Sequence, residues 1–183
     1  MIALRSFVSV LALAVTRFGR TLSRRDHVSP DVAVGSPAVM RALEAHTFSR
    51  PVEGNRLDTL LNGDEIFPAM LAEIRKARRT ITFANFLYER GDISREFAAA
   101  LAERCRAGVT VNVLLDAVGS SRMAEADQAV LRDAGCHLAF YRPLHPLAIR
   151  RFSHRNHRRV LVVDGRVDFT GGIGVGEAWT GNR

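Results

Sequence analysis

From residue 56 onward, two kinds of apolar pattern follow one another in turn along the chain. Segments with apolar residues three or four positions apart, which predict helices, alternate with short runs of β-branched and aromatic residues, which predict strands. The run at residues 109–115 is almost continuously apolar, which is typical of a strand covered on both faces. The alternation predicts an α/β sheet with helices on its faces. The expected strands cover residues 56–61, 80–88, 109–115 and 137–141, and the expected helices cover residues 64–78, 93–107 and 123–133.

A further pair of strands is expected in residues 160–170. The runs 160–163 and 166–170 flank Asp164-Gly165. Asp-Gly between two β-branched runs is a strong signal for a two-residue hairpin turn, because both central residues take positive φ. Side chains alternate across a strand, so counting outward from the turn separates them into two faces. The core face would hold Val160, Val162, Val167 and Phe169, and the other face would hold His157, Arg159, Thr170 and Gly172.

The second face of this hairpin has the residue types of a phosphate site. His157 and Arg159 would lie side by side, opposite Thr170 and a glycine that has no side chain to block a ligand. A guanidinium binds phosphate oxygens through several N–H donors. An unperturbed imidazole is largely a free base at neutral pH, so it can attack phosphorus. Asp164 has the opposite parity to His157 on a regular strand, so we do not expect them to touch, and Asp164 favours the turn.

A second cluster of polar residues follows the strand expected at residues 109–115. Asp116 comes directly after its apolar run, and Gly119 and Ser120 follow. Because α/β sheets bind ligands at the carboxyl ends of their strands, this segment is a candidate for part of the site.

Residues 142–156 form a basic loop that leads directly into His157. A basic loop beside a phosphate site would hold the rest of an anionic substrate, and Arg151 and Arg155 are the candidates for that contact. The alternative interpretation is a charged loop that is simply solvated.

Residues 1–25 differ from the rest of the chain. They combine an apolar run at residues 7–15 with arginines on both sides, and this run falls well short of the ~20 residues that a helix needs to span a bilayer. An arginine-rich anchor on anionic lipid and a terminal extension without a fold are both consistent with this segment.

Residues 26–55, broken by proline and glycine, are expected to be a linker with one short helix at residues 38–45. Residues 56–183 therefore form the expected domain.

The composition restricts the class of protein without choosing a function. The chain has 183 residues, of which 47% are hydrophobic and 25% charged, which fits one globular domain and excludes a disordered chain. The formal net charge of +7 favours nucleic acid, anionic lipid or phosphorylated substrates. Cys105 and Cys136 suggest neither a disulfide framework nor a metal site, and no metal or cofactor is expected.

The motif that begins at His157 resembles the signature of the phospholipase D superfamily, H-x-K-x4-D-x6-G-G. The spacing to Asp164 and to the pair Gly171-Gly172 fits at every position, and Arg159 stands where lysine is usual. Within that superfamily, residues 56–183 resemble the bacterial cardiolipin synthase branch, through the segments LLNGDEIFPAMLAEIRKARRTITFANFLYERGDI and GVTVNVLLDAVGS. Two further positions depart from the family pattern, namely Ala84 in place of a glutamate and Gly174 in place of an asparagine.

The resemblance implies a phospholipase D-like α/β/α sandwich, with a mixed sheet flanked by helices. It also implies a histidine nucleophile that forms a covalent phosphohistidine, while a second copy of the motif supplies the general acid. This sequence contains one copy, so we expect it to be one half of a two-lobed enzyme and inactive alone. The implied catalytic residues are His157, Arg159 and Asp164, and the implied phosphate-binding residues are Thr170, Gly171, Gly172, Arg151 and Arg155.

Three functions are consistent with these observations. The first is a phosphatidyltransferase of cardiolipin synthase type, peripheral to the cytoplasmic membrane of a bacterium, with anionic phospholipid as its substrate. The second is a phosphodiesterase or nuclease with one motif per chain, which acts as a homodimer. The third is a catalytically silent fragment that keeps the fold. The basic and apolar N-terminal segment favours the first, so the expected partners are a membrane surface and a second motif, from another half or a second copy, rather than nucleic acid.

Overall fold

The computed structural model describes residues 33, 35–143 and 155–181. The chain divides into two units, Met1–Leu57 and Asp58–Arg183, and each is described by itself. In the first unit, helix α2 spans Pro37–Thr47 and confirms the helix predicted at residues 38–45. It begins with a proline, which suits the first turn of a helix, and the side chain of Ser36 accepts a hydrogen bond from the backbone N–H of Val39.

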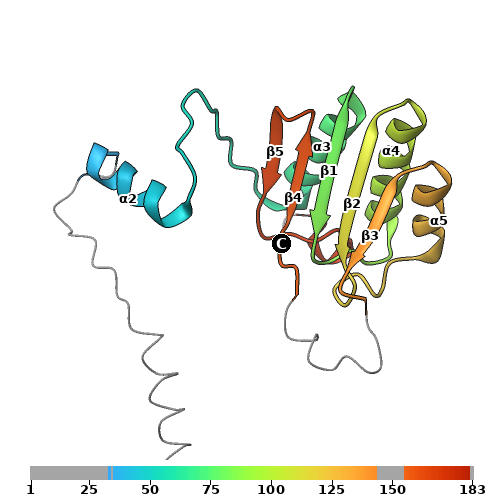
Figure 1. Cartoon of the computed structure of the whole chain (residues 1–183). Coiled ribbons are helices and arrows are strands. Elements are labelled where there is room, and N and C mark those ends of the chain that lie inside the picture. The colour runs from blue at the N-terminus through green and yellow to red at the C-terminus, as the bar shows by residue number, and fades with distance from the viewer. Residues whose placement is uncertain (1–32, 34, 144–154, 182–183) are drawn as a thin grey trace, which may run out of the picture. The chain divides into compact units, whose positions relative to one another are not determined.

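The second unit is built on a five-stranded mixed sheet with the order β3-β2-β1-β4-β5 (Figure 1). The three strands β1, β2 and β3 are parallel, whereas β4 runs antiparallel to both β1 and β5. The start of β4 therefore lies at the carboxyl end of β1. The strands are β1 Thr80–Asn85, β2 Thr110–Asp116, β3 His137–Tyr141, β4 Val160–Val163 and β5 Val167–Thr170.

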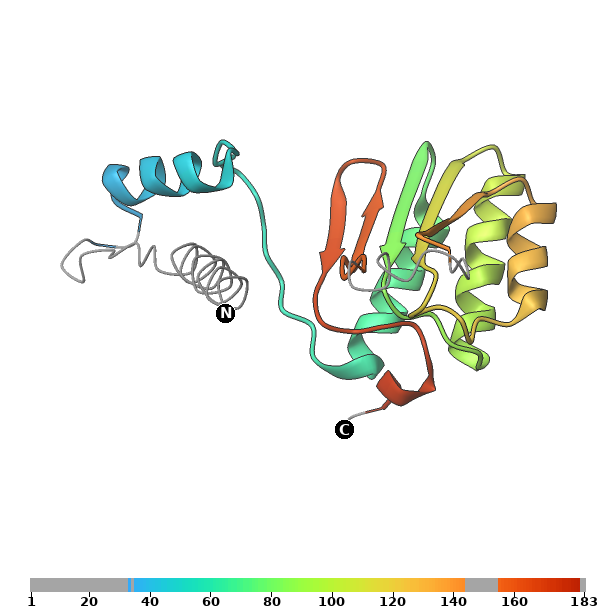
Figure 2. The ribbon, with the colours of Figure 1, turned by 60° about the horizontal axis from the view of Figure 1, so that its bottom comes forward.

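Three helices pack on one face of this sheet, as Figure 1 and Figure 2 show. They are α3 Asn62–Lys76, α4 Asp92–Arg106 and α5 Glu125–Asp133, which confirm the three predicted helices within a few residues. Their apolar stripes bury against every second residue of the strands, because side chains alternate across a strand. The fully buried side chains include Ile74, Phe97, Leu101 and Leu131 from the helices and Ile81, Phe83, Val111, Val113, Leu115 and Leu161 from the strands.

The opposite face of the sheet is not covered by any helix of the described residues. The prediction that the strand at 109–115 is covered on both faces is therefore wrong for this part of the chain. Burial alternates strictly along the first six residues of β2, so that Thr110, Asn112 and Leu114 are exposed while Val111 and Val113 are buried.

The strand predicted at residues 56–61 is also wrong. The segment belongs to no strand, and Leu57 is 93% exposed. A stretch with alternating apolar residues becomes a strand only where a neighbouring strand completes its hydrogen bonds, and the described chain offers this segment none.

The turn of the hairpin has the predicted geometry, but its strands pair one residue away from the predicted register. Asp164 and Gly165 both have positive φ, at 53° and 64°, and the backbone N–H of Arg166 donates to the carbonyl of Val163 over 3.0 Å. Val163 pairs with Val167 and not with Arg166, which is left over as an extra residue in the turn.

The changed register exchanges the two faces of β4. Leu161 and Val163 are buried, whereas Val160 and Val162, predicted for the core, lie on the other face and are only half-buried. The cause is the pairing of β4 with β1, which puts Leu161 opposite the buried Phe83 and Val163 opposite the buried Ile81. A shift of one residue in register moves a whole strand's side chains to the opposite face.

Candidate functional site

His157 lies at the carboxyl-end rim of the sheet, just before β4 begins. Because β4 is antiparallel to β1, this position is next to Phe86, the residue that follows β1. The imidazole stacks on the Phe86 ring, with 4.4 Å between ring centroids and 19° between ring planes. The residue is nevertheless exposed, so the ring is supported by Phe86 and remains accessible to a ligand.

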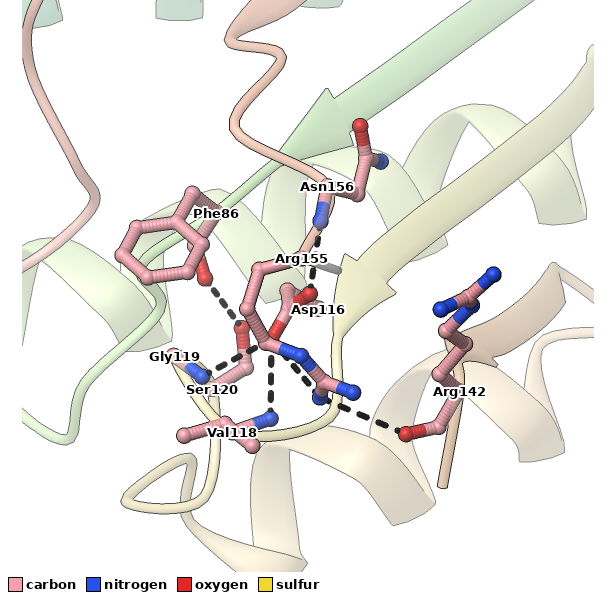
Figure 3. A network of polar contacts seen from close by, with 8 residues as sticks. All are labelled: Phe86, Asp116, Val118, Gly119, Ser120, Arg142, Arg155 and Asn156. Atoms are coloured by element: carbon pink, nitrogen blue, oxygen red, sulfur yellow. Dashed lines mark hydrogen bonds and ion pairs between the residues drawn. The ribbon is translucent and has the colours of Figure 1, made fainter. Parts of the chain in front are cut away.

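The carboxylate of Asp116, at the end of β2, holds the segment that leads into His157 (Figure 3). It is fully buried. Its Oδ2 accepts the backbone N–H of Asn156 at 2.9 Å, and its Oδ1 accepts the backbone N–H groups of Val118 at 2.9 Å and Gly119 at 3.2 Å. One side chain therefore closes the turn after β2 and anchors the chain one residue before His157.

The guanidinium of Arg155 lies beside the same carboxylate. Its Nη1 is 3.6 Å from Oδ1 of Asp116, and its side chain is only 10% exposed. The same nitrogen donates to the backbone carbonyl of Arg142 at 3.4 Å. A buried carboxylate needs a positive partner and hydrogen-bond donors to offset its lost hydration. Arg155 supplies the charge, and it also brings together the two ends of the basic loop at residues 142–156.

Phe86 is fixed by the same turn after β2. The hydroxyl of Ser120 donates to the backbone carbonyl of Phe86 at 3.3 Å. Gly119 lies so close that an added Cβ would be 2.1 Å from that carbonyl oxygen, so only glycine fits there. The side-chain carbonyl of Asn85, which is buried, accepts the backbone N–H of Leu87 at 3.2 Å.

Arg159 connects the start of β4 with the glycine pair after β5. Its Nη1 donates to the backbone carbonyl of Gly172 at 2.5 Å, and its Nε finds no acceptor among the described residues. Thr170, Gly171 and Gly172 are all exposed. An added Cβ at Gly171 or Gly172 would meet nothing within 4 Å, so the space that the sequence suggested over the glycines is open. Thr170 pairs with Val160 and not with Arg159, so the prediction that Arg159 lies opposite Thr170 is wrong.

Asp164 lies at the opposite end of β4 from His157. Its carboxylate accepts three backbone N–H groups at the start of β1, from Arg78 at 2.9 Å, Arg79 at 2.8 Å and Thr80 at 2.9 Å. These bonds, with that from Thr80 the largest contribution, lower the pKa of Asp164 because they favour the charged form. Asp164 thus binds the hairpin turn to β1. This is the turn-stabilising role that the sequence favoured, and these contacts do not involve the other predicted catalytic residues.

The segment after the glycine pair crosses the end of β1. Val175 exchanges backbone hydrogen bonds with Leu87 and Glu89, both at 2.9 Å. A Cβ added at Gly174 would lie 2.7 Å from the Cβ of Leu87 and 3.0 Å from the Trp179 ring. This lack of space gives a physical reason why the chain has glycine where the family usually has asparagine.

The sequence indicates Asp116, Gly119 and Ser120 as a candidate segment but does not indicate Phe86. The sequence contains no separate signal for this residue, because Phe86 falls inside the strand predicted at residues 80–88, whereas β1 ends at Asn85. Arg151, predicted to bind phosphate, lies outside the described residues, as do residues 144–154. In the described part of the chain, no group of three or more histidine, cysteine, aspartate or glutamate side chains is arranged to hold a metal ion.

A mixed sheet with helices packed on it, and a histidine–arginine motif at its rim, define a domain of the phospholipase D-like class. The family model described as "Cardiolipin synthase, PLD-like domain" matches residues 70–180. The chain belongs to this family, which confirms the resemblance seen in the sequence.

The relatives include cardiolipin synthases of several bacteria. The chain is 35% identical over 125 residues to "Cardiolipin synthase" of Geobacillus kaustophilus, a match that covers 68% of this chain and 25% of the relative. It is 35% identical over 130 residues to "Cardiolipin synthase A" of Pseudomonas fluorescens, covering 70% and 27%. It is 31% identical over 131 residues to "Major cardiolipin synthase ClsA" of Bacillus subtilis, covering 70% and 27%. The matched part therefore spans about a quarter of each of these relatives.

Two solved structures are similar over part of the chain. One is Nuc of Salmonella typhimurium, a phospholipase D family member, with 19% identity and a TM-score of 0.48 over 63% of this chain and 68% of that chain. The other is NucT of Helicobacter pylori, with 15% identity and a TM-score of 0.46 over 63% and 70%.

Proposed function

We propose that this chain carries the nucleophile of a phosphatidyltransferase of cardiolipin synthase type, which acts on the phosphodiester of a phospholipid. An imidazole nitrogen of His157 attacks phosphorus, a covalent phosphohistidine forms and the first alcohol leaves. A hydroxyl of the acceptor lipid then attacks phosphorus and gives its proton to the group that protonated the first alcohol, the N–P bond breaks and a new phosphodiester forms. The enzyme returns to its starting state, because one phosphodiester is exchanged for another.

The observation that carries this proposal is the position of the His157 ring. It is exposed at the carboxyl-end rim of the sheet and supported on one face by Phe86, and the glycine pair after β5 leaves open space. A nucleophile must be held and also be reachable by the substrate. The relatives' names give the substrate class, since the chain is up to 35% identical to proteins called cardiolipin synthases.

Arg159 is proposed to neutralise the phosphoryl oxygens as charge develops in the transition state. Its Nη1 holds the backbone carbonyl of Gly172, which keeps the guanidinium beside the glycine pair. Thr170, Gly171, Gly172, Arg151 and Arg155 remain proposed phosphate contacts, although Arg155 is partly occupied by Asp116. Asp164 is proposed to act only through the turn that it stabilises.

The leaving alcohol needs a proton, which the proposed mechanism takes from a second motif histidine. The sequence contains the motif once, so the second histidine would come from another part of a longer protein or from a second copy of this chain.

We further propose a peripheral position on an anionic membrane, where the basic segments meet lipid headgroups. No helix of the described residues is both long enough and apolar enough to cross a bilayer.

A phosphodiester with a good leaving group tests His157 without requiring the second histidine. A phosphatidyl p-nitrophenyl ester in vesicles releases p-nitrophenolate, which leaves without a proton. We expect the chain to release a burst of p-nitrophenolate equal to the amount of protein and to retain a phosphatidyl group on His157. Natural phospholipid, whose alcohol must be protonated, should not turn over with the chain alone.

His157→Ala should abolish both the burst and the covalent label, whereas the neighbouring exposed Arg158→Ala should retain them. Labelled protein from the His157→Ala variant would exclude His157 as the nucleophile.

Binding to anionic vesicles and to duplex DNA, each measured over a series of salt concentrations, separates the substrate classes. Cleavage of DNA that depends on His157, with no reaction on lipid, would replace the proposed function with a nuclease.

A further inference from the structure

The turn at the end of β2, residues 116–120, contacts Phe86 and the residue that precedes its stacking partner His157. Asp116 holds the backbone of Asn156, one residue before His157. Gly119 and Ser120 lie against the backbone carbonyl of Phe86, the ring on which His157 stacks. The two stacked residues are 71 positions apart in the sequence, yet one five-residue turn contacts both Phe86 and Asn156, the residue before His157 (Figure 3).

We propose that Asp116 is a positioning residue for His157, acting with Arg155 through the backbone of Asn156. The inference rests on the proposed function, since it names the group that orients its nucleophile. Asp116 does not approach the open side of the site itself, because it is fully buried and its oxygens are directed at three backbone N–H groups and Arg155.

The carboxylate is the side chain best suited to this task, because each of its oxygens only accepts hydrogen bonds. Oδ1 faces the N–H groups of Val118 and Gly119, and Oδ2 faces the N–H of Asn156. An asparagine has the same shape, but one of its two ends carries an NH2 group. Whichever way the amide is turned, either the turn or Asn156 would face a donor in place of an acceptor.

Arg155 extends this arrangement to the end of β3. Its Nη1 reaches both Oδ1 of Asp116 and the carbonyl of Arg142, the residue that follows β3. The ends of β2 and β3 and the start of the motif are thereby connected through one guanidinium. A loss of charge at Asp116 weakens this connection at the same time as it releases Asn156.

The test measures the position of the His157 ring and does not require catalysis. In NMR spectra of the imidazole C–H groups of the full 183-residue chain, a stacked aromatic ring shifts the resonances of His157 upfield. His157→Gln assigns these resonances, and Phe86→Leu gives their unstacked position. We expect Asp116→Asn to lose more than half of this upfield shift, together with the nuclear Overhauser contacts between the rings.

Asp127→Asn is the matched control, since Asp127 is also a buried carboxylate, 4% exposed, but belongs to α5 and not to the turn that contacts Asn156 and Phe86. It should retain the full upfield shift. A folded Asp116→Asn protein with wild-type His157 resonances would overturn the proposal. If Asp116→Asn does not fold, Arg155→Gln replaces it, and wild-type His157 resonances in that variant would equally overturn the proposal. Arg155→Lys, which keeps the charge, should recover part of the shift.

In the p-nitrophenolate burst assay, Asp116→Asn should slow the burst by roughly tenfold to a hundredfold, because a small misplacement of a reacting group has effects of that size. The lipid concentration that gives half of the maximal burst rate should be nearly unchanged. A shift in the His157 resonances without any burst in the wild-type chain would retain the positioning role and reject the proposed function. A burst that is the same in both proteins, with the stack intact, would reject the positioning role alone.

Discussion

Asp116 and Asp164 use the same chemistry at opposite ends of the sheet. Each carboxylate accepts three backbone N–H groups at 2.8–3.2 Å. Asp116 sits at the carboxyl end of β2, is fully buried and has Arg155 beside it. Asp164 sits in the hairpin turn, lies near the surface and accepts its three hydrogen bonds from the backbone at the start of β1.

The difference between them shows that the position of a residue in the fold decides what it can contribute. Asp164 belongs to the motif by sequence but lies at the end of β4 away from His157. Asp116 is 41 residues before His157 in the sequence, yet it holds the residue adjacent to it. The spacing from His157 to Asp164 therefore follows from the geometry of the hairpin, in which Asp164 binds the start of β1.

Glycine substitutions in the turns of Asp116 and Asp164 are expected to show the largest difference between the two ends of the sheet. Gly119→Ala would bring a Cβ to 2.1 Å from the Phe86 carbonyl, and such overpacking costs about 1–3 kcal/mol. Gly165→Ala in the other turn meets nothing within 4 Å but has φ of 64°, which costs about 1–2 kcal/mol. Both proteins should be less stable in urea, but only Gly119→Ala should shift the His157 resonances. A shift in both variants would mean that the two ends are coupled through β4.

A smaller effect is expected from Asp164→Asn, and it should depend on pH. The folded state lowers the pKa of Asp164, so the carboxylate stabilises the fold above its unfolded pKa of about 3.9 and loses this contribution as pH falls through the folded value. The free energy of unfolding of the variant should be lower than that of the wild type at pH 7. The difference should shrink toward pH 3. Urea titrations at both pH values measure it, and a difference independent of pH would show that the charge is not involved.

The smallest effect is expected from Arg159→Lys, which restores the usual family residue. Lysine keeps the positive charge but replaces a planar fork with a compact ammonium. We expect the burst rate to stay equal or to rise, and Arg159→Gln to lose most of it. A clear loss in the lysine variant would show that the guanidinium, which holds the Gly172 carbonyl, is itself required.

The sequence by itself determined the local elements and the family. The three helices on the sheet, the strands β1 to β3 and the positive-φ turn at Asp164-Gly165 were all predictable, because period and turn chemistry act between residues that are close in the sequence. The spacing from His157 to Gly172 was sufficient to identify the family, which the match over residues 70–180 confirmed. The proposed site residues from this motif remain predictions of the sequence.

Only the tertiary structure decided the register of β4, the uncovered face of β2 and the partners of the two carboxylates. Each of these depends on contacts between distant segments, since β4 takes its register from β1 some 80 residues earlier in the sequence. The backbone donors of Asp164 are 84 to 86 residues away from it, and Asn156 is 40 residues away from Asp116. Local patterns carry no information about which distant strand will supply a hydrogen bond, because that choice follows from burial of the common core. The stack of His157 on Phe86 arises in the same way, from two strand ends that the antiparallel pairing of β1 and β4 brings together.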